Sequence, residues 1–156
     1  MTELKFQIRA ATLSDITPIS FIYQLTRSLT YTKSTIEDTI KFHLQNTIAE
    51  RPTFFNVAEL NGDIIAFSVA RYSSHEDAYE LECSCHSAFR NQGLGSTLLK
   101  YQIDECHTNG ISLFFASVQP DNITCLNMLK NLGFEAEQIN HHQKTEYLKL
   151  DLNVPR

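Results

Sequence analysis

The chain has 156 residues, the size of one ordinary domain, so it can bury a core without disulfide or metal staples. Its 13 basic and 18 acidic residues leave a net charge of −5, and no block of Lys or Arg forms a face for nucleic acid. No apolar run approaches the roughly 18 residues that span a membrane, and the start MTELKFQIRA lacks the apolar segment of a secretory signal. We therefore expect a cytoplasmic protein without a membrane or nucleic-acid partner.

The N-terminal part predicts one strand followed by two helices. Residues 6–12 read as the strand, and Ser14 with Asp15 is the expected N-cap of a helix with four apolar positions, Ile16, Ile19, Tyr23 and Leu29. Ser34 and Glu37 have capping-box spacing. A repeat of four predicts a second helix ending near residues 51–52, with Ile36, Ile40, Leu44 and Ile48 on one face.

The rest of the chain predicts a hairpin and then alternating strands and helices. Asn61-Gly62 separates strands at 53–60 and 63–72, and a third strand covers 78–86. After a glycine loop come a helix, a strand at 111–118, a short helix over 122–132 and one or two strands within 135–152. The fold class is therefore α+β or mixed α/β, in the order β-α-α-β-β-β-α-β-α-β(-β), as one domain over residues 1–156.

The glycine loop FRNQGLGSTLL, residues 89–99, holds two of only five glycines. Because it joins a strand to a helix expected to start near Gly95, it places backbone amides at the positive end of a helix dipole, where they can bind a phosphate. A Walker loop is excluded because Ser96 and Thr97 follow without a lysine. A dinucleotide loop is excluded because Leu98 stands where a third glycine or alanine is needed.

Residues 90–95, RNQGLG, resemble the Arg/Gln-x-x-Gly-x-Gly/Ala signature of the GCN5-related N-acetyltransferase (GNAT) superfamily, whose loop binds the pyrophosphate of acetyl-CoA. Residues 122–134, NITCLNMLKNLGF, resemble its later motif, in which an asparagine opens a helix that closes with Gly-Phe. The element order also matches over nearly the whole chain. The resemblance implies a central, mostly antiparallel twisted sheet of six to seven strands flanked by about four helices.

The resemblance also implies acetyl-CoA as co-substrate and assigns residues to it. The strand that contains Cys85 would pair its backbone with the pantetheine arm, as in strand addition. Asn122 would contact the cofactor near its pantetheine end, and it can cap its helix at the same time. The pyrophosphate contacts fall on Arg90, Gln92, Gly93, Gly95 and Ser96.

The implied chemistry needs a base for the amine and a route for the leaving thiolate. Alternation puts Glu80 and Glu82 on one side of the predicted strand, opposite Leu81, Cys83 and Cys85. Many relatives carry a carboxylate on this strand, so Glu82 is the expected base, with an ordinary solvent-facing glutamate as the alternative.

One position departs from the family pattern. Many relatives have a tyrosine as general acid four residues before the glycine of Gly-Phe, and this chain has Leu129 there. Two readings remain. The favoured one is an active acetyltransferase acting on a primary amine of a small molecule or peptide, because the phosphate loop and Asn122 are retained. A thiol of pKa about 8.5 leaves readily, so the reaction can proceed without the tyrosine. The other is a degenerate acyl-CoA-binding domain. Homodimers are common among relatives, and the residues leave that arrangement open.

The remaining chemistry-bearing residues have simpler readings. The four cysteines, Cys83, Cys85, Cys106 and Cys125, lack zinc-knuckle spacing and are expected to be reduced thiols packed as small apolar groups. A metal site from Cys83, Cys85, His86, His141 and His142 is disfavoured, since the family needs no metal. Tyr31 and Thr32 fall in the segment that varies with the acceptor in relatives, which makes them candidate acceptor contacts.

Overall fold

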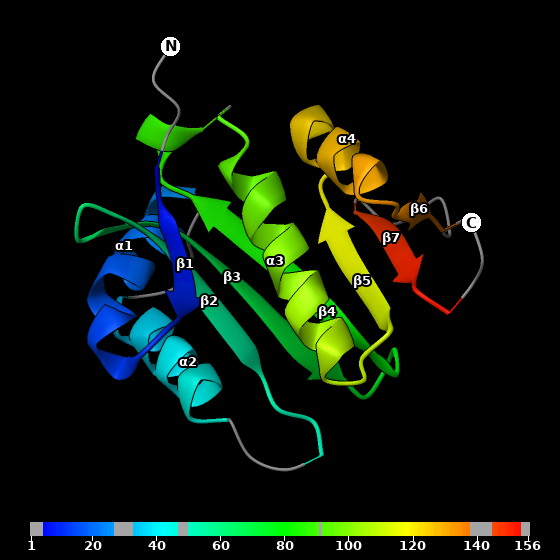
Figure 1. Cartoon of the computed structure of the whole chain (residues 1–156), viewed down its shortest axis with the longest axis horizontal. Coiled ribbons are helices and arrows are strands. Elements are labelled where there is room, and N and C mark those ends of the chain that lie inside the picture. Colours follow the sequence, from blue (N-terminus) through cyan, green and yellow to red (C-terminus); the bar gives the residue numbers. More distant parts are fainter. Residues whose placement is uncertain (1–4, 27–32, 47–49, 91, 138–144, 154–156) are drawn as a thin grey trace.

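The computed structural model describes residues 5–26, 33–46, 50–90, 92–137 and 145–153. Within these ranges seven strands form one sheet in the order β1-β2-β3-β4-β5-β7-β6 (Figure 1). All neighbouring pairs among them are antiparallel except β4 and β5. The strands are β1 Gln7–Ala10, β2 Phe54–Leu60, β3 Asp63–Ser73, β4 Ala78–Cys85, β5 Leu113–Val118, β6 Glu135–Ala136 and β7 Glu146–Asp151.

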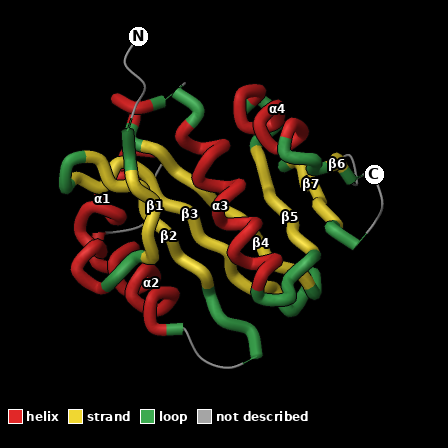
Figure 2. The backbone as a smooth tube through the Cα atoms, viewed as in Figure 1, coloured by secondary structure: helices red, strands yellow, loops and turns green. Residues whose placement is uncertain are grey.

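Helices cover both faces of the sheet. Because side chains alternate along a strand, β2 and β3 present two apolar sets, one to each face. Val57, Phe67 and Val69 pack with the first two helices, whereas Ala58 and Ala66 pack with the third. Figure 2 shows the third helix lying across the strands near the middle of the sheet. The helices are α1 Ile16–Thr26, α2 Lys33–Gln45, α3 Leu94–Thr108 and α4 Ile123–Asn131.

The predicted hairpin is confirmed. Leu60 pairs with Asp63 across the turn, and the two turn residues have positive φ, 51° at Asn61 and 87° at Gly62. These are the left-handed conformations that a two-residue hairpin needs and that Asn-Gly supplies at low cost. A bulge between Ala58 and Glu59 shifts the register once within the pair.

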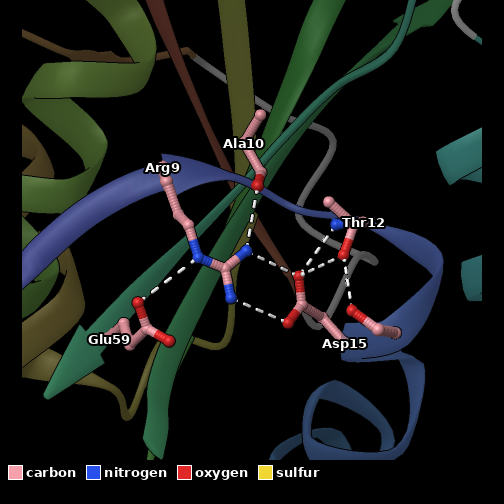
Figure 3. Close-up of polar contacts among 6 residues, drawn as sticks. Arg9, Ala10, Thr12, Asp15 and Glu59 are labelled. Carbon is pink, nitrogen blue, oxygen red and sulfur yellow. Dashed lines mark hydrogen bonds and ion pairs between the residues drawn. The ribbon is translucent and has the colours of Figure 1, made fainter. Parts of the chain in front are cut away.

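The start of α1 differs in detail from the prediction. Thr12, not Ser14, is the capping residue, because a turn of 3-10 helix at Leu13–Asp15 precedes α1. The Asp15 carboxylate accepts a hydrogen bond from the Thr12 backbone N–H at 2.8 Å (Figure 3). Arg9 of β1 donates two more to the same carboxylate, at 2.8 and 2.9 Å. This cluster therefore fixes how the chain passes from β1 to α1.

The second helix ends earlier than predicted. It closes at Gln45, six residues before Arg51, and Ser34 lies inside it rather than before it. The Asn46 side chain donates to Thr53 Oγ1 at 3.1 Å, and the Thr53 N–H donates to the Asn46 carbonyl at 2.9 Å. This pair of bonds joins the end of α2 to the start of β2. The predicted apolar positions Leu29 and Ile48 lie outside the described residues.

A polar residue fixes α3 on the sheet. Gln102 is fully buried, and its side-chain oxygen accepts hydrogen bonds from Asn56 of β2 at 2.6 Å and Ser68 of β3 at 2.5 Å. Its amide donates to the carbonyl of Phe54 at 2.9 Å. Buried polar groups satisfied in this way define one arrangement of the elements that carry them.

The Asp15 cluster predicts an acid-sensitive contribution to stability. Hydrogen bonding from Arg9 outweighs burial and holds the pKa of Asp15 below its ordinary 3.8, so its contribution is present above that value and is lost as the pH falls through the folded-state pKa. We expect Asp15→Asn to lower the free energy of unfolding by about 1–3 kcal/mol near neutral pH. The difference in free energy of unfolding between this variant and the wild type, measured by urea denaturation, should become smaller toward about pH 3.

The control for this prediction is Asp104→Asn, which removes an exposed carboxylate that pairs with the exposed Lys100 on α3 at 3.3 Å. Its unfolding curve should stay near that of the wild type, because exposed pairs contribute little. An Asp15→Asn deficit of the same size at both pH values would contradict the assignment.

Candidate functional site

The sheet opens at the junction of β4 and β5. The ladder between them has two rungs, Tyr79 with Phe114 and Glu80 with Phe115. Beyond these rungs β4 continues to Cys85 with its other edge paired to β3, while β5 continues to Val118 paired to β7. Figure 1 shows the two strands moving apart toward this end, with α3 starting there. We call this region the fork; it is where an extended ligand can add to β4 as a strand.

The glycine loop leads from the fork into α3. The His86 N–H donates to the Ile65 carbonyl at 2.8 Å, and a turn of 3-10 helix, η2, follows at Ser87–Phe89. Gly93 is the N-cap of α3 with φ of 75°, which favours glycine. The predicted strand, glycine turn and helix are therefore confirmed, with the helix beginning at Leu94, one residue earlier than expected.

Gly95 lies where α3 approaches both β4 and α4 closely. A Cβ atom on Gly95 would stand 3.4 Å from Met128 Sδ of α4 and 3.7 Å from Cys85 Sγ of β4. The first turn of α3 is thus held directly above the fork. Its first N–H groups have no partner within the helix, so they are the donors that an anion at this position would meet.

The predicted carboxylates lie on the opposite face of β4. Glu80 and Glu82 point to the side covered by α1 and α2, and Arg71 of β3 donates to both, to Glu82 Oε2 at 2.8 Å. The Glu82 side chain is 18% exposed, so it is partly buried rather than fully solvent-facing, and its role as the base stays a prediction. Burial opposes the charge on Arg71, but the two carboxylates raise its pKa above the ordinary value.

His43 of α2 is a further titratable group near this ion cluster. Its Nδ1 atom is buried and has no hydrogen-bond partner among the described residues. Burial, with the nearby charge of Arg71, lowers the pKa of His43, so the ring is neutral near pH 7. Sequence reasoning missed both Arg71 and His43. The signal for Arg71 was its position across the hairpin from the glutamates, which becomes visible only once the register is known.

Asn122 caps α4, as one of its two predicted roles requires. Its side chain accepts a hydrogen bond from the Cys125 N–H at 3.2 Å. Arg90, Gln92 and Gly93 are exposed on the loop, and Ser96 is half-buried in the first turn of α3. Their contacts with a cofactor remain predictions.

The family model of the acetyltransferase (GNAT) family matches residues 19–134, which include most of α1, the fork, the glycine loop and α4. The chain belongs to this family. The resemblance read from the glycine loop and the Asn122 helix is thereby confirmed.

Solved structures share the GNAT fold over most of their length. An N-acetyltransferase from Staphylococcus aureus Mu50 superposes with a TM-score of 0.79 at 17% identity, covering 95% of this chain and 99% of the other. The protein yncA from Salmonella typhimurium, solved with its cofactor acetyl-CoA, gives 0.78 at 19% identity, with 97% and 96% covered. A phosphinothricin acetyltransferase from Sinorhizobium meliloti in complex with AcCoA gives 0.78 at 17% identity, with 94% and 88% covered.

The residue that departs from the GNAT pattern, Leu129, is packed in the core. Leu129 is 2% exposed and belongs to the apolar cluster between α4, β5 and β7, together with Phe114 and Leu148. Cys125, one turn earlier on α4, is partly buried against the same cluster. At this position the chain therefore has a core side chain without a proton to donate.

The metal site, membrane spans and acceptor contacts considered from the sequence remain to be compared with the structure. Among the described residues no three His, Cys, Asp or Glu side chains are grouped so that they could hold a metal. The described helices include none that is both long and apolar enough to cross a membrane. Tyr31, Thr32, His141 and His142 lie outside the residues that the structure describes.

The Arg71 cluster predicts a structural cost for removing the cation. Arg71→Met keeps the length of the side chain but leaves Glu80 and Glu82 without their shared cation on a largely buried face. We expect a loss of about 1–3 kcal/mol in the free energy of unfolding at neutral pH. Lys100→Met, in an exposed pair on α3, is the control and should cost far less. Equal losses in the two variants, measured by urea denaturation, would show that Arg71 is no more than a surface charge.

Proposed function

We propose that this GNAT protein is an N-acetyltransferase that moves the acetyl group of acetyl-CoA to a primary amine by direct attack on the thioester. The observation that carries the proposal is the position of the glycine turn and the first turn of α3, directly above the β4–β5 fork. A turn that can bind phosphate beside a strand edge would supply the two surfaces that a diphosphate joined to a pantetheine arm requires. The acetyl-CoA complexes of two similar structures support the same cofactor.

The cofactor would lie along the fork from the loop inward. Backbone amides from Gln92 to Ser96 receive the pyrophosphate, and Arg90 adds a positive charge beside it. The pantetheine arm runs along β4 from Cys85 toward Leu81, hydrogen-bonding to the backbone so that side-chain identity matters little. Asn122, at the N-terminus of α4 on the other side of the fork, contacts the arm.

The acceptor would approach from the face that carries Glu82. The amine nitrogen attacks the thioester carbonyl carbon, and a backbone N–H of β4 stabilises the developing oxyanion. The tetrahedral intermediate then expels the CoA thiolate while Glu82, directly or through a water, takes the amine proton. Arg71 keeps this carboxylate oriented. With Leu129 in place of a donor, the sulfur leaves as thiolate, which a pKa of about 8.5 permits.

The alternative is an acyl-CoA-binding domain that has lost turnover. Two observations favour it: the core position of Leu129 and the pairing of Glu82 with Arg71. Both readings require the cofactor, and they differ only in the transfer step. Small-molecule amines and the amines of peptides are the acceptors to screen.

The proposed cofactor position predicts that alanine at two glycines, one at each end of α3, has different effects on CoA affinity. Gly93 and Gly110 both have positive φ, 75° and 86°, and a Cβ on either would meet nothing within 4 Å. Alanine should therefore cost each about 1 kcal/mol of stability through backbone strain. Only Gly93→Ala adds its methyl at the phosphate position, so it should weaken CoA binding at least tenfold, about 1.4 kcal/mol, by titration calorimetry. Equal dissociation constants for the two variants would contradict this cofactor position.

The proposed mechanism predicts that replacing either of two glutamates on β4 has different effects on activity. Glu82→Gln should lower kcat by about 10²- to 10⁴-fold with the best amine of the panel, because a general base is lost. Activity should partly recover at high pH, where the amine deprotonates in solution. Glu80→Gln also removes a partner of Arg71 and is the matched control, expected to keep most of its activity. If the wild type binds CoA but consumes no acetyl-CoA with any amine, the degenerate reading is correct.

A further inference from the structure

Two thiols lie side by side beneath the first turn of α3. Cys83 and Cys85 are two residues apart on β4 and point to the same face, toward α3 and α4. A Cβ atom on Gly95 would stand 4.0 Å from Cys83 Sγ and 3.7 Å from Cys85 Sγ, so both sulfurs adjoin one point of the fork. Nothing in the proposed transfer reaction uses either side chain.

The two thiols differ in their proton affinity. Hydrogen bonding from the Cys83 thiol, aided by the charge of Arg90 and opposed by burial, lowers the pKa of Cys85. The same hydrogen bond, together with burial, raises the pKa of Cys83. Burial raises the pKa of the other two cysteines, Cys106 to about 12 and Cys125 less. Among the four, Cys85 is thus the favoured nucleophile, and Cys83 is the thiol beside it.

The spacing permits a disulfide between these neighbours. Residues two apart on a strand have Cα atoms about 6.6 Å apart, near the upper limit of the 4.4–6.8 Å range for disulfides, and their parallel side chains leave the Cβ atoms farther apart than the 3.5–4.5 Å that the bond needs. Closing the bond therefore bends the strand. Disulfides with such strain are the easily reduced ones, which suits a reversible modification rather than a structural crosslink.

We propose that Cys83 and Cys85 form an oxidation site in the cofactor groove, which hydrogen peroxide converts to a disulfide that weakens acetyl-CoA binding. The second half of this inference rests on the proposed function. The bend falls on the part of β4 that would pair with the pantetheine arm, between the rungs that join Cys83 to Ser68 and Cys85 to Ala66.

The chemistry balances without a further reactant. The Cys85 sulfur attacks one peroxide oxygen, the O–O bond breaks, and a sulfenic acid and hydroxide form. The Cys83 sulfur then attacks the sulfenic sulfur, the S–O bond breaks and the S–S bond forms. The protons of the two thiols end on the departing oxygens. Two thiols and one peroxide therefore give one disulfide and two waters.

Tryptic digestion separates the four cysteines into two pairs. Cleavage after Arg71 and Arg90 releases residues 72–90 with Cys83 and Cys85, and cleavage after Lys100 and Lys130 releases residues 101–130 with Cys106 and Cys125. After peroxide treatment of the full chain and alkylation of the remaining thiols, peptide 72–90 should escape alkylation and be about 2 Da lighter than its dithiol form. Prior reduction should abolish this change. An alkylated peptide 72–90, or a crosslink between the two peptides, would overturn the assignment.

Cofactor binding tests the consequence on the same samples. Peroxide should weaken CoA binding by the wild type at least tenfold in calorimetry, and a thiol reductant should restore it. Each variant is compared with its own untreated sample: Cys83→Ser should lose this sensitivity, whereas Cys106→Ala, altered on the far part of α3, should keep it. A disulfide that leaves CoA affinity unchanged would overturn the inference. Failure of the reduced wild type to bind CoA would instead refute the proposed function.

Discussion

The two-rung ladder between β4 and β5 is the constraint on which the rest of the site depends. In a sheet whose other neighbours pair along most of their length, this pair is parallel and stops after Glu80 and Phe115. Each strand stays fully supported on its other side, β4 by β3 and β5 by β7. The interior of the sheet therefore contains a strand edge without the instability of a free outer edge. Because α3 begins at this edge, the first N–H groups of the helix and the backbone N–H groups of the strand edge face the same region.

The two faces of the fork have different electrical characters. On the α3 side lie the glycine turn, the helix N-terminus and the sulfur atoms of β4 and α4, a surface suited to a diphosphate and an apolar arm. On the α1–α2 side lie two carboxylates bridged by Arg71, with a neutral His43 nearby. In the proposed complex, such an arrangement would keep the two carboxylates away from the phosphates of acetyl-CoA and leave Glu82 within the thickness of one sheet from the thioester. Strand alternation alone achieves this separation.

Much of this arrangement could be read from the sequence because its signals are local. Asn61-Gly62 specifies a hairpin by backbone conformation, and Gly93 with Gly95 specifies a turn into a helix, so both were predicted correctly. The alternation that separates Glu82 from Cys85 is also a local property. Arg71 was missed because its partners are set by the register between β3 and β4, which local sequence patterns do not determine. The cap at Thr12 was missed because a 3-10 turn adds one turn before α1.

The buried Gln102 has a consequence for the direction in which the first turn of α3 points. A helix lying on a sheet through apolar contacts alone can rotate about its axis and still bury similar area. Gln102 removes that freedom, since its three hydrogen bonds to β2 and β3 can all form at only one rotation of α3 about its axis. Gly95 lies seven residues earlier, two helical turns away on the same side of α3. The hydrogen bonds of Gln102 under the middle of α3 thus fix the orientation of the loop at its start, some 10 Å away.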